Sequence, residues 1–501
     1  MSTAVLSPPQ AQAHDLATEA GPAESGVRIA GRARTLALVS LLLASMMELI
    51  DVTIVNVALP TIEASLGATG GLLQWVVAAY PLAFGISLIT GARLGDRFGR
   101  RRLFLLGLVG FTLASAACGI APNVEALVLF RAVQGIAAAA MVPQVLTSIQ
   151  VMYAPHERGT AMGIFSGLAG LAAVIGPILG AVLTESAGWR WVFLVNLPVG
   201  LIALIAALRF IPESRAEHAT RLDLRGVIVL SAALLAILYP LTMGHDLGWP
   251  IWSYAVMLAG LLSLALFIRA EYRHERRGDQ PLLATSLYAS RAFCGGTLTG
   301  ALLFVAGTGY FLAGTLYFQI GLGWSVLQAG LVNIPFAIIC TITAGTGAAV
   351  LMPRIGRQVL TIGALIMALG AGVMALTVHQ ADSATSFWAF VPAITLFGAG
   401  FGFVVSSTAP LALVAVDGRM AGAASGQFNT TGQLANAFGA AALGTLFFEV
   451  AKRQAAQVPS EIFGPAFLAV LAVMVGLLLL VAFATRIIPA DAHVHAAPGA
   501  H

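Results

Sequence analysis

The chain has 501 residues, of which 58% are hydrophobic and only 10% are charged, and its mean hydropathy is +0.90. Soluble domains carry roughly 25% charged residues, and one soluble core could not bury this much apolar surface. The composition therefore excludes an ordinary soluble domain and predicts an all-α integral membrane protein. The basic charge is almost all arginine, since Lys452 is the only lysine, and it gives no reason to expect a nucleic-acid partner.

Fourteen segments are apolar enough to cross a bilayer as helices, which takes about 20 residues each. In chain order they are 36–58, 73–92, 103–121, 124–150, 159–182, 190–210, 224–243, 251–270, 293–317, 326–350, 358–378, 387–412, 421–447 and 464–486. Residues 1–35 lack the pattern of a signal peptide and are expected to form a disordered tail. Residues 487–501 are expected to form a second tail, with His493, His495 and His501 solvated rather than bound to metal.

A faint internal repeat divides the spans into two halves. The segment "RFGRRRL" at 97–103 follows the second span, and "RIGRQVL" at 354–360 follows the tenth. Two halves built from repeated helical units are a common transporter architecture. We therefore expect a six-helix bundle over 36–210, a linker with two extra spans over 211–292 and a second six-helix bundle over 293–486.

The basic residues predict how the spans are oriented. With the N-terminus placed inside, nearly all arginines fall in the inner connections, whereas the outer connections carry only Arg190, Lys452 and Arg453. An odd number of spans would scramble this segregation. The pattern predicts a multi-pass protein of the cell (cytoplasmic) membrane with both termini in the cytoplasm, in contact with membrane lipids.

The first span contains two acids, Glu48 and Asp51, in the run "MMELIDVTIVNVALP". A spacing of three places them one turn apart on a helix. An ionised carboxylate near the middle of a bilayer costs about 2.5–3.5 kcal/mol, so these acids should face a water-filled cavity or a polar partner. Burial and mutual repulsion favour reversible protonation. We interpret them as a proton or cation site, with Asp51 leading because it lies deeper; the alternative is a fixed buried salt bridge.

A short basic turn with one acid, "ARLGDRFGRRR" at 92–102, follows the second span. Its acid can cap the following helix or pair with an arginine across the inner face. The acid and the glycines are unnecessary for a pure topology signal, so we interpret the turn as an inner gate that breaks on opening. The residues assigned to this gate are Asp96, Arg97, Gly99, Arg100 and Arg101.

The fourth span contains a basic residue, Arg131, in "LVLFRAVQGIAAAAMVP". A buried guanidinium needs hydrogen-bond partners, and Gln134 lies one turn further along. We interpret Arg131 as coupled to the protonation site or shaping the cavity; the alternative is a structural pair with a helix end.

The fifth span has small residues at every third or fourth position and ends in Gly176, Pro177 and Gly180. Proline removes one helix hydrogen bond and can bend the span, while glycines allow close helix contact. The pattern fits a gate hinge and a packing surface, which are not exclusive.

Aromatic residues form a stripe in the ninth span, where Phe304, Phe311 and Phe318 recur at every seventh position beside Tyr310 and Tyr317. Such a stripe can line an apolar substrate pocket that also holds cations. Ordinary packing or lipid exposure is the commoner explanation of this pattern.

Several chemistries have no signature in the sequence. There is no Walker loop, G-x-S-x-G elbow or H-E-x-x-H pattern. Cys118, Cys294 and Cys340 lie in apolar runs without metal-ligand spacing and are interpreted as buried free thiols. The sequence therefore predicts no enzyme, no metal site and no bound cofactor.

These motifs together resemble those of the major facilitator superfamily, in its fourteen-span drug:proton antiporter group, over nearly all of 36–486. "LIDVTIVNVALP" resembles the first-span motif, with its acid at Asp51, and "LVLFRAVQGIAAA" resembles the fourth-span motif. "AAVIGPILGA" is similar to the fifth-span antiporter motif, with Ala172 and Ala181 in place of its first and last glycines. "WRWVFLVNLPVG" at 189–200 is similar to the entry of the sixth span.

The basic turn resembles the loop motif of the superfamily, although Ala92 stands where the motif opens with glycine. Its repeat copy has Pro353 in place of the acid, so only one half keeps the lock. The resemblance implies two six-helix bundles plus two inserted helices, and a monomer that takes up protons and exports a small molecule.

The resemblance implies export of a lipophilic, often cationic drug or antibiotic, driven by the proton gradient and by alternating access. A second hypothesis is export of an endogenous metabolite, a lipid or a self-made antibiotic. A third is a receptor or scaffold that binds without transporting, against which the intramembrane acids and the bent glycine-rich span argue. Transport of a ligand by the purified protein separates the third hypothesis from the other two.

Overall fold

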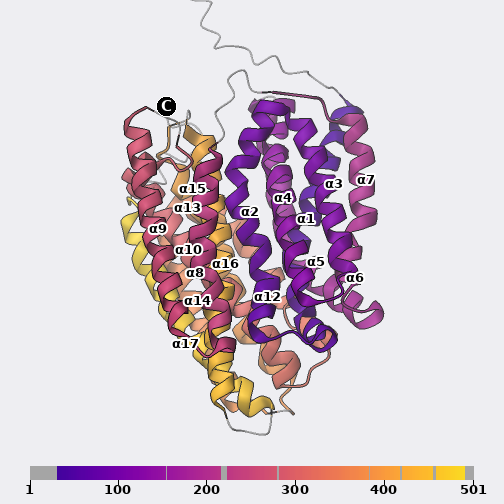
Figure 1. Cartoon of the computed structure of the whole chain (residues 1–501), viewed down its shortest axis with the longest axis vertical. Helices are drawn as coiled ribbons and strands as arrows, with labels where there is room; N and C mark the ends of the chain where they lie inside the picture. Colours follow the sequence, from indigo (N-terminus) through magenta and orange to yellow (C-terminus); the bar gives the residue numbers. More distant parts are fainter. Residues whose placement is uncertain are drawn as a thin grey trace, which may run out of the picture.

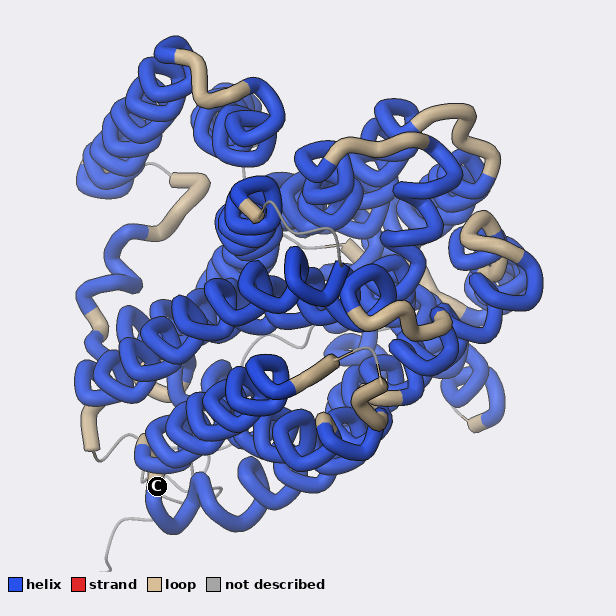
Figure 2. Tube along the Cα trace, turned by 90° about the horizontal axis from the view of Figure 1, so that it is seen from below, coloured by secondary structure: helices blue, strands red, loops and turns tan. Residues whose placement is uncertain are grey.

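The computed structural model of the chain describes residues 31–153, 155–215, 223–278, 281–382, 384–417, 420–454 and 459–490. Within these ranges all regular structure is helical (Figures 1 and 2). The N-terminal half consists of α1 (Arg32–Leu66), α2 (Gly70–Phe98), α3 (Arg100–Gly119), α4 (Val124–Met152), α5 (Pro155–Ala187), α6 (Trp191–Leu194) and α7 (Asn196–Phe210). Two further helices follow, α8 (Leu224–Leu247) and α9 (Ile251–Arg276).

The C-terminal half begins with the 3-10 turn η1 (Thr285–Ala289), and its described residues contain eight α-helical segments interrupted by short π-helical and 3-10 turns. These elements are α10 (Arg291–Leu316), η2 (Tyr317–Gly321), α11 (Val326–Leu331), α12 (Ile334–Thr346), η3 (Gly347–Leu351), α13 (Met352–Ile355), α14 (Gln358–Gln380), η4 (Phe387–Ala389), α15 (Val391–Leu413), α16 (Ala421–Arg453), α17 (Pro459–Ala484) and η6 (Thr485–Ile487).

The helices follow the predicted spans closely. Among the described residues, 13 helices are long and apolar enough to cross a membrane. The remaining predicted span, 159–182, falls on α5, which has 33 residues. Helix α1 begins at Arg32, inside the predicted tail, because Arg34 donates two hydrogen bonds to Glu157 at 2.7 and 3.0 Å. Residues 1–30 and 491–501, including His493, His495 and His501, lie outside the described residues.

One buried apolar cluster lies within the N-terminal half and a larger one runs from that half into the C-terminal half, while α8 and α9 pair with each other beside both halves (Figure 1). In the N-terminal half α2 packs on α4, α4 on α3, and α1 on α5 and α7. In the C-terminal half α14 packs on α15 and α17, α12 on α15, and α10 on α16. Helix α2 also packs along α16, and α8 contacts both of them. The inserted pair therefore lies against the seam between the halves.

The predicted repeat has a structural counterpart at two glycines. Gly99 separates α2 from α3 with φ of 110°, and Gly356 separates α13 from α14 with φ of 54°. Backbone with positive φ strongly favours glycine because other residues clash there. The two related sequence segments thus each join two helices through a glycine with positive φ.

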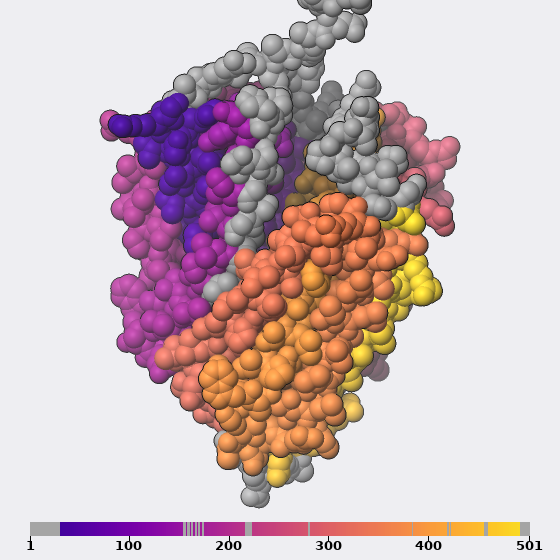
Figure 3. Space-filling view, turned by 180° about the vertical axis from the view of Figure 1, so that it is seen from behind, coloured from indigo at the N-terminus to yellow at the C-terminus, as the bar shows by residue number. Residues whose placement is uncertain are grey.

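The two ends of the helix array differ in how the halves meet. We use the term basic end for the end of the molecule at which α2 ends and α16 begins. At the basic end the Arg93 side chain donates to the Pro281 carbonyl at 2.5 Å, and the Ala284 amide donates to the Gln427 side chain at 3.1 Å. At the opposite end the Leu327 amide donates to Glu185 at 2.8 Å, and Gln319 donates to the Val57 carbonyl at 2.8 Å. The direct contacts between the two halves gather toward this opposite end. Figure 3 shows the magenta and orange surfaces meeting directly in the lower part of the molecule.

Close helix crossing in the N-terminal half depends on glycines that face backbone. A Cβ added at Gly91 on α2 would lie 2.0 Å from the Ala139 carbonyl oxygen on α4. Backbone cannot move aside as a side chain can, so this crossing tolerates only glycine.

We expect Gly91→Ala to destabilise the purified protein by about 1–3 kcal/mol, the usual cost of overpacking. The measurement is the melting temperature in detergent. Gly372→Ala on α14 is the matched control, because a Cβ there meets nothing within 4 Å. Equal melting temperatures for the two variants would contradict the proposed crossing.

Candidate functional site

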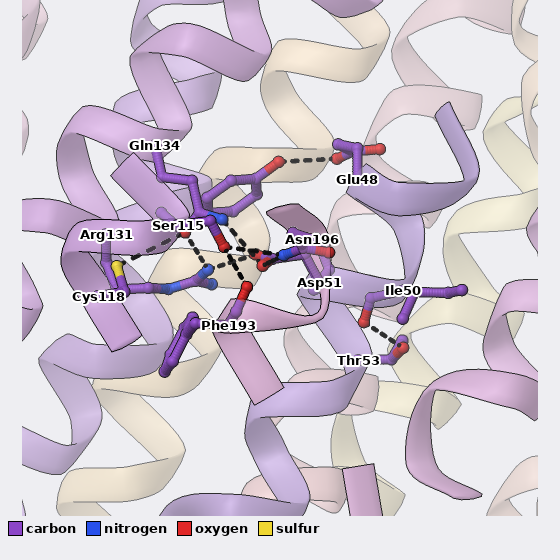
Figure 4. A network of polar contacts seen from close by, with 12 residues as sticks. Glu48, Ile50, Asp51, Thr53, Ser115, Cys118, Arg131, Gln134, Phe193 and Asn196 are labelled. Carbon is purple, nitrogen blue, oxygen red and sulfur yellow. Dashed lines mark hydrogen bonds and ion pairs between the residues drawn. The ribbon is translucent and has the colours of Figure 1, made fainter. Parts of the chain in front are cut away.

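The first-span acid Asp51 lies at the centre of a buried polar network in the N-terminal half (Figure 4). Its side chain is 0% exposed. Arg131 Nη1 on α4 donates to Asp51 Oδ2, and the two side chains form an ion pair. Gln134 Nε2 donates to Asp51 Oδ1 at 2.8 Å. The structure therefore brings Asp51, Arg131 and Gln134 together. The contact is the buried salt bridge that the sequence analysis gave as the alternative, and the role of these residues in proton coupling stays a prediction.

Arg131 is held by more than the carboxylate. Its Nη1 also donates to Gln134 Oε1 at 2.8 Å. The guanidinium carbon lies 4.6 Å from the ring centre of Tyr80 and 5.9 Å from that of Phe193, within the range of cation–π attraction. The arginine is 2% exposed, so these groups replace the water that it would otherwise hold.

Two polar residues of this network were given no role by the sequence. Asn196, the first residue of α7, donates to Asp51 Oδ1 at 2.8 Å and to Ser115 Oγ on α3 at 2.9 Å. Ser115 in turn donates to the Phe193 carbonyl at 2.9 Å. The helix is interrupted at Val195, between α6 and α7, and α7 packs against α1 with Asn196 as its first residue. The signal available in the sequence was an asparagine inside the apolar run "VFLVNLPVG".

The second acid, Glu48, lies one turn earlier on α1 and is 5% exposed. Tyr80 on α2 donates its hydroxyl proton to Glu48 Oε1 at 3.0 Å. The same tyrosine turns its ring toward Arg131. Tyr80 therefore joins the two acidic positions, with its polar tip on one carboxylate and its ring facing the cation that balances the other.

The geometry determines how Asp51 could exchange a proton. Its carboxylate accepts from Arg131, Gln134 and Asn196, which is an arrangement suited to the ionised form. A buried ion pair is held strongly, since removing one partner typically costs about 3–5 kcal/mol. The carboxylate and the arginine are therefore held together by direct contact, and proton exchange at Asp51 stays a prediction.

The predicted inner-gate residues form contacts within the N-terminal half at the basic end. Arg100 donates to Asp96 Oδ1 through Nε at 3.1 Å and Nη2 at 3.0 Å. The Arg101 amide donates to Glu213 at 3.2 Å, and the Arg100 amide donates to the Ser214 carbonyl at 2.9 Å. The described contacts tie the turn to the segment after α7; Arg97 faces the ring of Phe98. Gating stays a prediction.

The glycines of the fifth span lie directly beside the acid-bearing helix. A Cβ at Gly176 would be 1.9 Å from Thr53 Oγ1, and one at Gly180 would be 2.8 Å from Ile54 Cγ1. Pro177 lies inside α5, and its carbonyl approaches Gly330 of α11. These residues therefore provide a close packing surface between α5 and α1, two residues past Asp51, while their role as a hinge stays a prediction.

The aromatic stripe divides between the core and less buried positions. Tyr310, Tyr317 and Phe318 are 2%, 1% and 2% exposed and pack against other rings of the C-terminal half. Phe304 packs against Gly432, and Phe311 is partly buried with its ring 5.2 Å from that of Phe336. The first three side chains act in packing here, and a substrate pocket along the stripe stays a prediction.

The fold and the site define a multi-pass membrane transporter, with two helical halves and a buried ion pair inside the N-terminal half. A family model described as "Major Facilitator Superfamily" matches residues 41–440. The chain belongs to the major facilitator superfamily, as the sequence motifs predicted.

Curated relatives cover most of the chain. The probable actinorhodin transporter of Streptomyces coelicolor is 37% identical over 82% of this chain and 72% of the relative. The puromycin resistance protein of Streptomyces alboniger is 35% identical over 82% and 81%. The cephamycin export protein of Amycolatopsis lactamdurans is 35% identical over 91% and 93%.

Solved structures support the fold. A bacterial homologue of the human lysosomal transporter Spinster, in an inward-facing conformation, aligns with a TM-score of 0.64, 17% identity and coverage of 92% of this chain and 98% of that chain. The D-xylose-proton symporter aligns with a TM-score of 0.62, 15% identity and coverage of 91% and 98%. At these identities the likeness concerns the fold alone.

We expect Arg131→Met to destabilise the protein by about 3–5 kcal/mol, because it leaves the Asp51 carboxylate buried without its cation. Adding Asp51→Asn should recover most of the loss, since the second change removes the unbalanced charge. Thermal unfolding of wild type, both single variants and the double variant gives the coupling between the two positions. Additive losses would show that the pair contributes little.

Proposed function

We propose that the chain exports lipophilic, often cationic small molecules, antibiotics among them, in exchange for protons. The observation that carries the proposal is the Asp51–Arg131 ion pair, fully buried within a membrane-spanning bundle. An intramembrane acid of this kind is costly and marks an ion or proton pathway in transporters. Relatives named for antibiotic export or resistance support the class of cargo.

Coupling follows from the network around Asp51. A proton on the carboxylate cancels its attraction for Arg131, and the arginine keeps Gln134 Oε1 and the faces of Tyr80 and Phe193 as partners. The cation can therefore be released without losing every contact. Protonation then changes the relative stability of the two access states, which shifts their populations. One proton crossing a potential of 100 mV supplies about 2.3 kcal/mol, so no bound cofactor is needed.

The remaining assignments follow from this cycle. The basic end faces the cytoplasm by the positive-inside rule, which places both termini inside at the cytoplasmic membrane. The contacts between the halves at the opposite end support an inward-open state. The Asp96–Arg100 turn acts as the inner gate, and the Gly176–Pro177–Gly180 surface lets α5 move on α1. One copy of the chain is sufficient, because both halves come from it.

A self-made compound is the second candidate cargo. Actinorhodin, tetracenomycin C and cephamycin each appear in the name of a relative, which supports one dedicated compound, whereas relatives named as multidrug resistance proteins support a wide range of drugs. A screen of dyes, antiseptics and antibiotics in a pump-deficient host, with and without a protonophore, separates the two. Protection against one chemical class supports a dedicated exporter, whereas protection against many supports a multidrug pump.

We expect Asp51→Asn to lower proton-driven transport of ethidium into inverted proteoliposomes by at least about tenfold, because the amide cannot carry the coupling proton. Ethidium binding, measured by fluorescence anisotropy, should be retained. The control is Asp382→Asn, which changes an exposed acid in the connection after α14. Undiminished pH-driven transport by Asp51→Asn would remove Asp51 from the coupling mechanism.

A further inference from the structure

A groove lies over helix α2, between its neighbours α4 and α8, and we use the term side groove for it. Its volume is about 400 Å³. Small side chains leave this space open, because Ala79 and Ala83 of α2 and Ala132 of α4 are among the residues that line it. Helix α2 packs on both α4 and α8, so the side groove lies where the N-terminal half meets the inserted pair.

The side groove opens toward lipid. Leu129 and Ile136 of α4 and Leu235 of α8 line it and are 61%, 54% and 45% exposed. Helices α2, α4 and α8 are all long and apolar enough to cross a membrane. Large apolar side chains that stay exposed on such a surface are solvated by hydrocarbon chains. An occupant of the side groove therefore comes from the bilayer.

The dimensions of the side groove suit an acyl chain better than a helix. On α2 its lining runs from Trp75 to Ser87, a separation of 12 positions that rises about 18 Å. One leaflet contributes about 15 Å of hydrocarbon, half the thickness of the bilayer core. A helix of that length, with a diameter of about 10 Å, would fill roughly 1,400 Å³, more than three times the volume of the side groove.

Two polar groups lie at the end of the side groove where α2 and α4 begin, which is the opposite end of the molecule. Glu125, in the first turn of α4, is exposed and is the one charged side chain among the described residues that line the groove. Trp75, in the second turn of α2, is 8% exposed, and its Nε1–H has no hydrogen-bond partner among the described residues. This end therefore offers a negative charge and an unsatisfied donor, and the groove continues from it between apolar side chains.

A phospholipid with an amine head group carries complementary groups in the same order. Its ammonium complements the Glu125 carboxylate, and its acyl chain follows the apolar length of the groove. Its ester carbonyl, which lies between the two, accepts from the Trp75 indole once the ring turns toward it. A buried donor without an acceptor is costly, and an ester oxygen relieves that cost. A head group with negative charge alone is repelled by Glu125.

We propose that the side groove binds the acyl chain of an aminophospholipid, such as phosphatidylethanolamine, from the leaflet at the opposite end, with its ammonium beside Glu125. The bound chain contacts α2, α4 and α8 together, so it packs the inserted pair against the N-terminal half. Helix α8 thereby gains a role as one wall of a lipid site. This binding needs neither a proton nor a cargo, so it goes beyond the proposed export.

The test is photolabelling of the full chain in nanodiscs, with the labelled positions mapped by mass spectrometry of peptides. The probes are phosphatidylethanolamine and phosphatidylglycerol, each with a diazirine in one acyl chain. We expect phosphatidylethanolamine to label the lining of the side groove roughly two- to fivefold more than phosphatidylglycerol, the preference that an exposed ion pair provides. Both probes should label the exposed face of α9, where Leu258 and Leu262 lie, to the same extent.

Two variants address the two parts of the site. Glu125→Gln removes the charge and should bring the labelling ratio close to one. Its matched control is Glu461→Gln, because Glu461 is also an exposed acid in the first turn of a helix, α17, at the same end. Ala132→Phe fills the groove and should lower labelling by both probes severalfold, whereas Ala255→Phe, at an exposed position of α9 outside the groove, should leave it unchanged.

Three results would overturn the proposal. They are labelling of the side groove no stronger than labelling of α9, equal labelling by the two probes in the wild type, and a preference that survives Glu125→Gln in folded protein. Displacement of the lipid by excess ethidium, with loss of ethidium transport in Ala132→Phe, would assign the groove to the cargo and also overturn it. Labelling is measured without a proton gradient, so its outcome is independent of whether Asp51 couples transport to protons.

Discussion

The ion pair between Asp51 and Arg131 is the interaction on which the N-terminal half depends. Neither charge has water to solvate it, so each element around the pair supplies a dipole, an amide or a ring face. Gln134 and Asn196 both donate to the second oxygen of the carboxylate, Oδ1, and the Tyr80 ring lies against the cation. Helices α1, α2, α4 and α7 are thereby fixed relative to one another by polar contacts as well as by packing.

Hydropathy was sufficient to place the spans, because every helix that crosses the bilayer needs about 20 mostly apolar residues whatever its neighbours are. The contacts between helices depend instead on individual polar and small side chains. Asp51 and Arg131 were recognisable since a charge in an apolar run stands out, and Gln134 followed from helical spacing. Asn196 and Ser115 are small polar residues of ordinary kinds. Asn196 reaches the carboxylate at the start of α7, directly after Val195, and Ser115 on α3 joins the network only through Asn196 and the Phe193 carbonyl.

The predictions also differed in how much tertiary context they needed. The glycines of α5 were expected to allow close contact, and the structure gives them a specific partner in Thr53 and Ile54. The seven-residue period of the aromatic stripe indicates that its residues share one face of a helix. The period does not show whether that face meets other helices, lipid or a cavity. Tyr310, Tyr317 and Phe318 turned out to face the core of the C-terminal half.

The complete burial of Asp51 has a consequence for the timing of proton uptake. A carboxylate with no exposed surface and three donors in place is out of reach of bulk solvent from either compartment. A hydrogen ion reaches it only after the surrounding helices have moved. In the proposed mechanism, uptake of the ion is therefore tied to the conformational change itself.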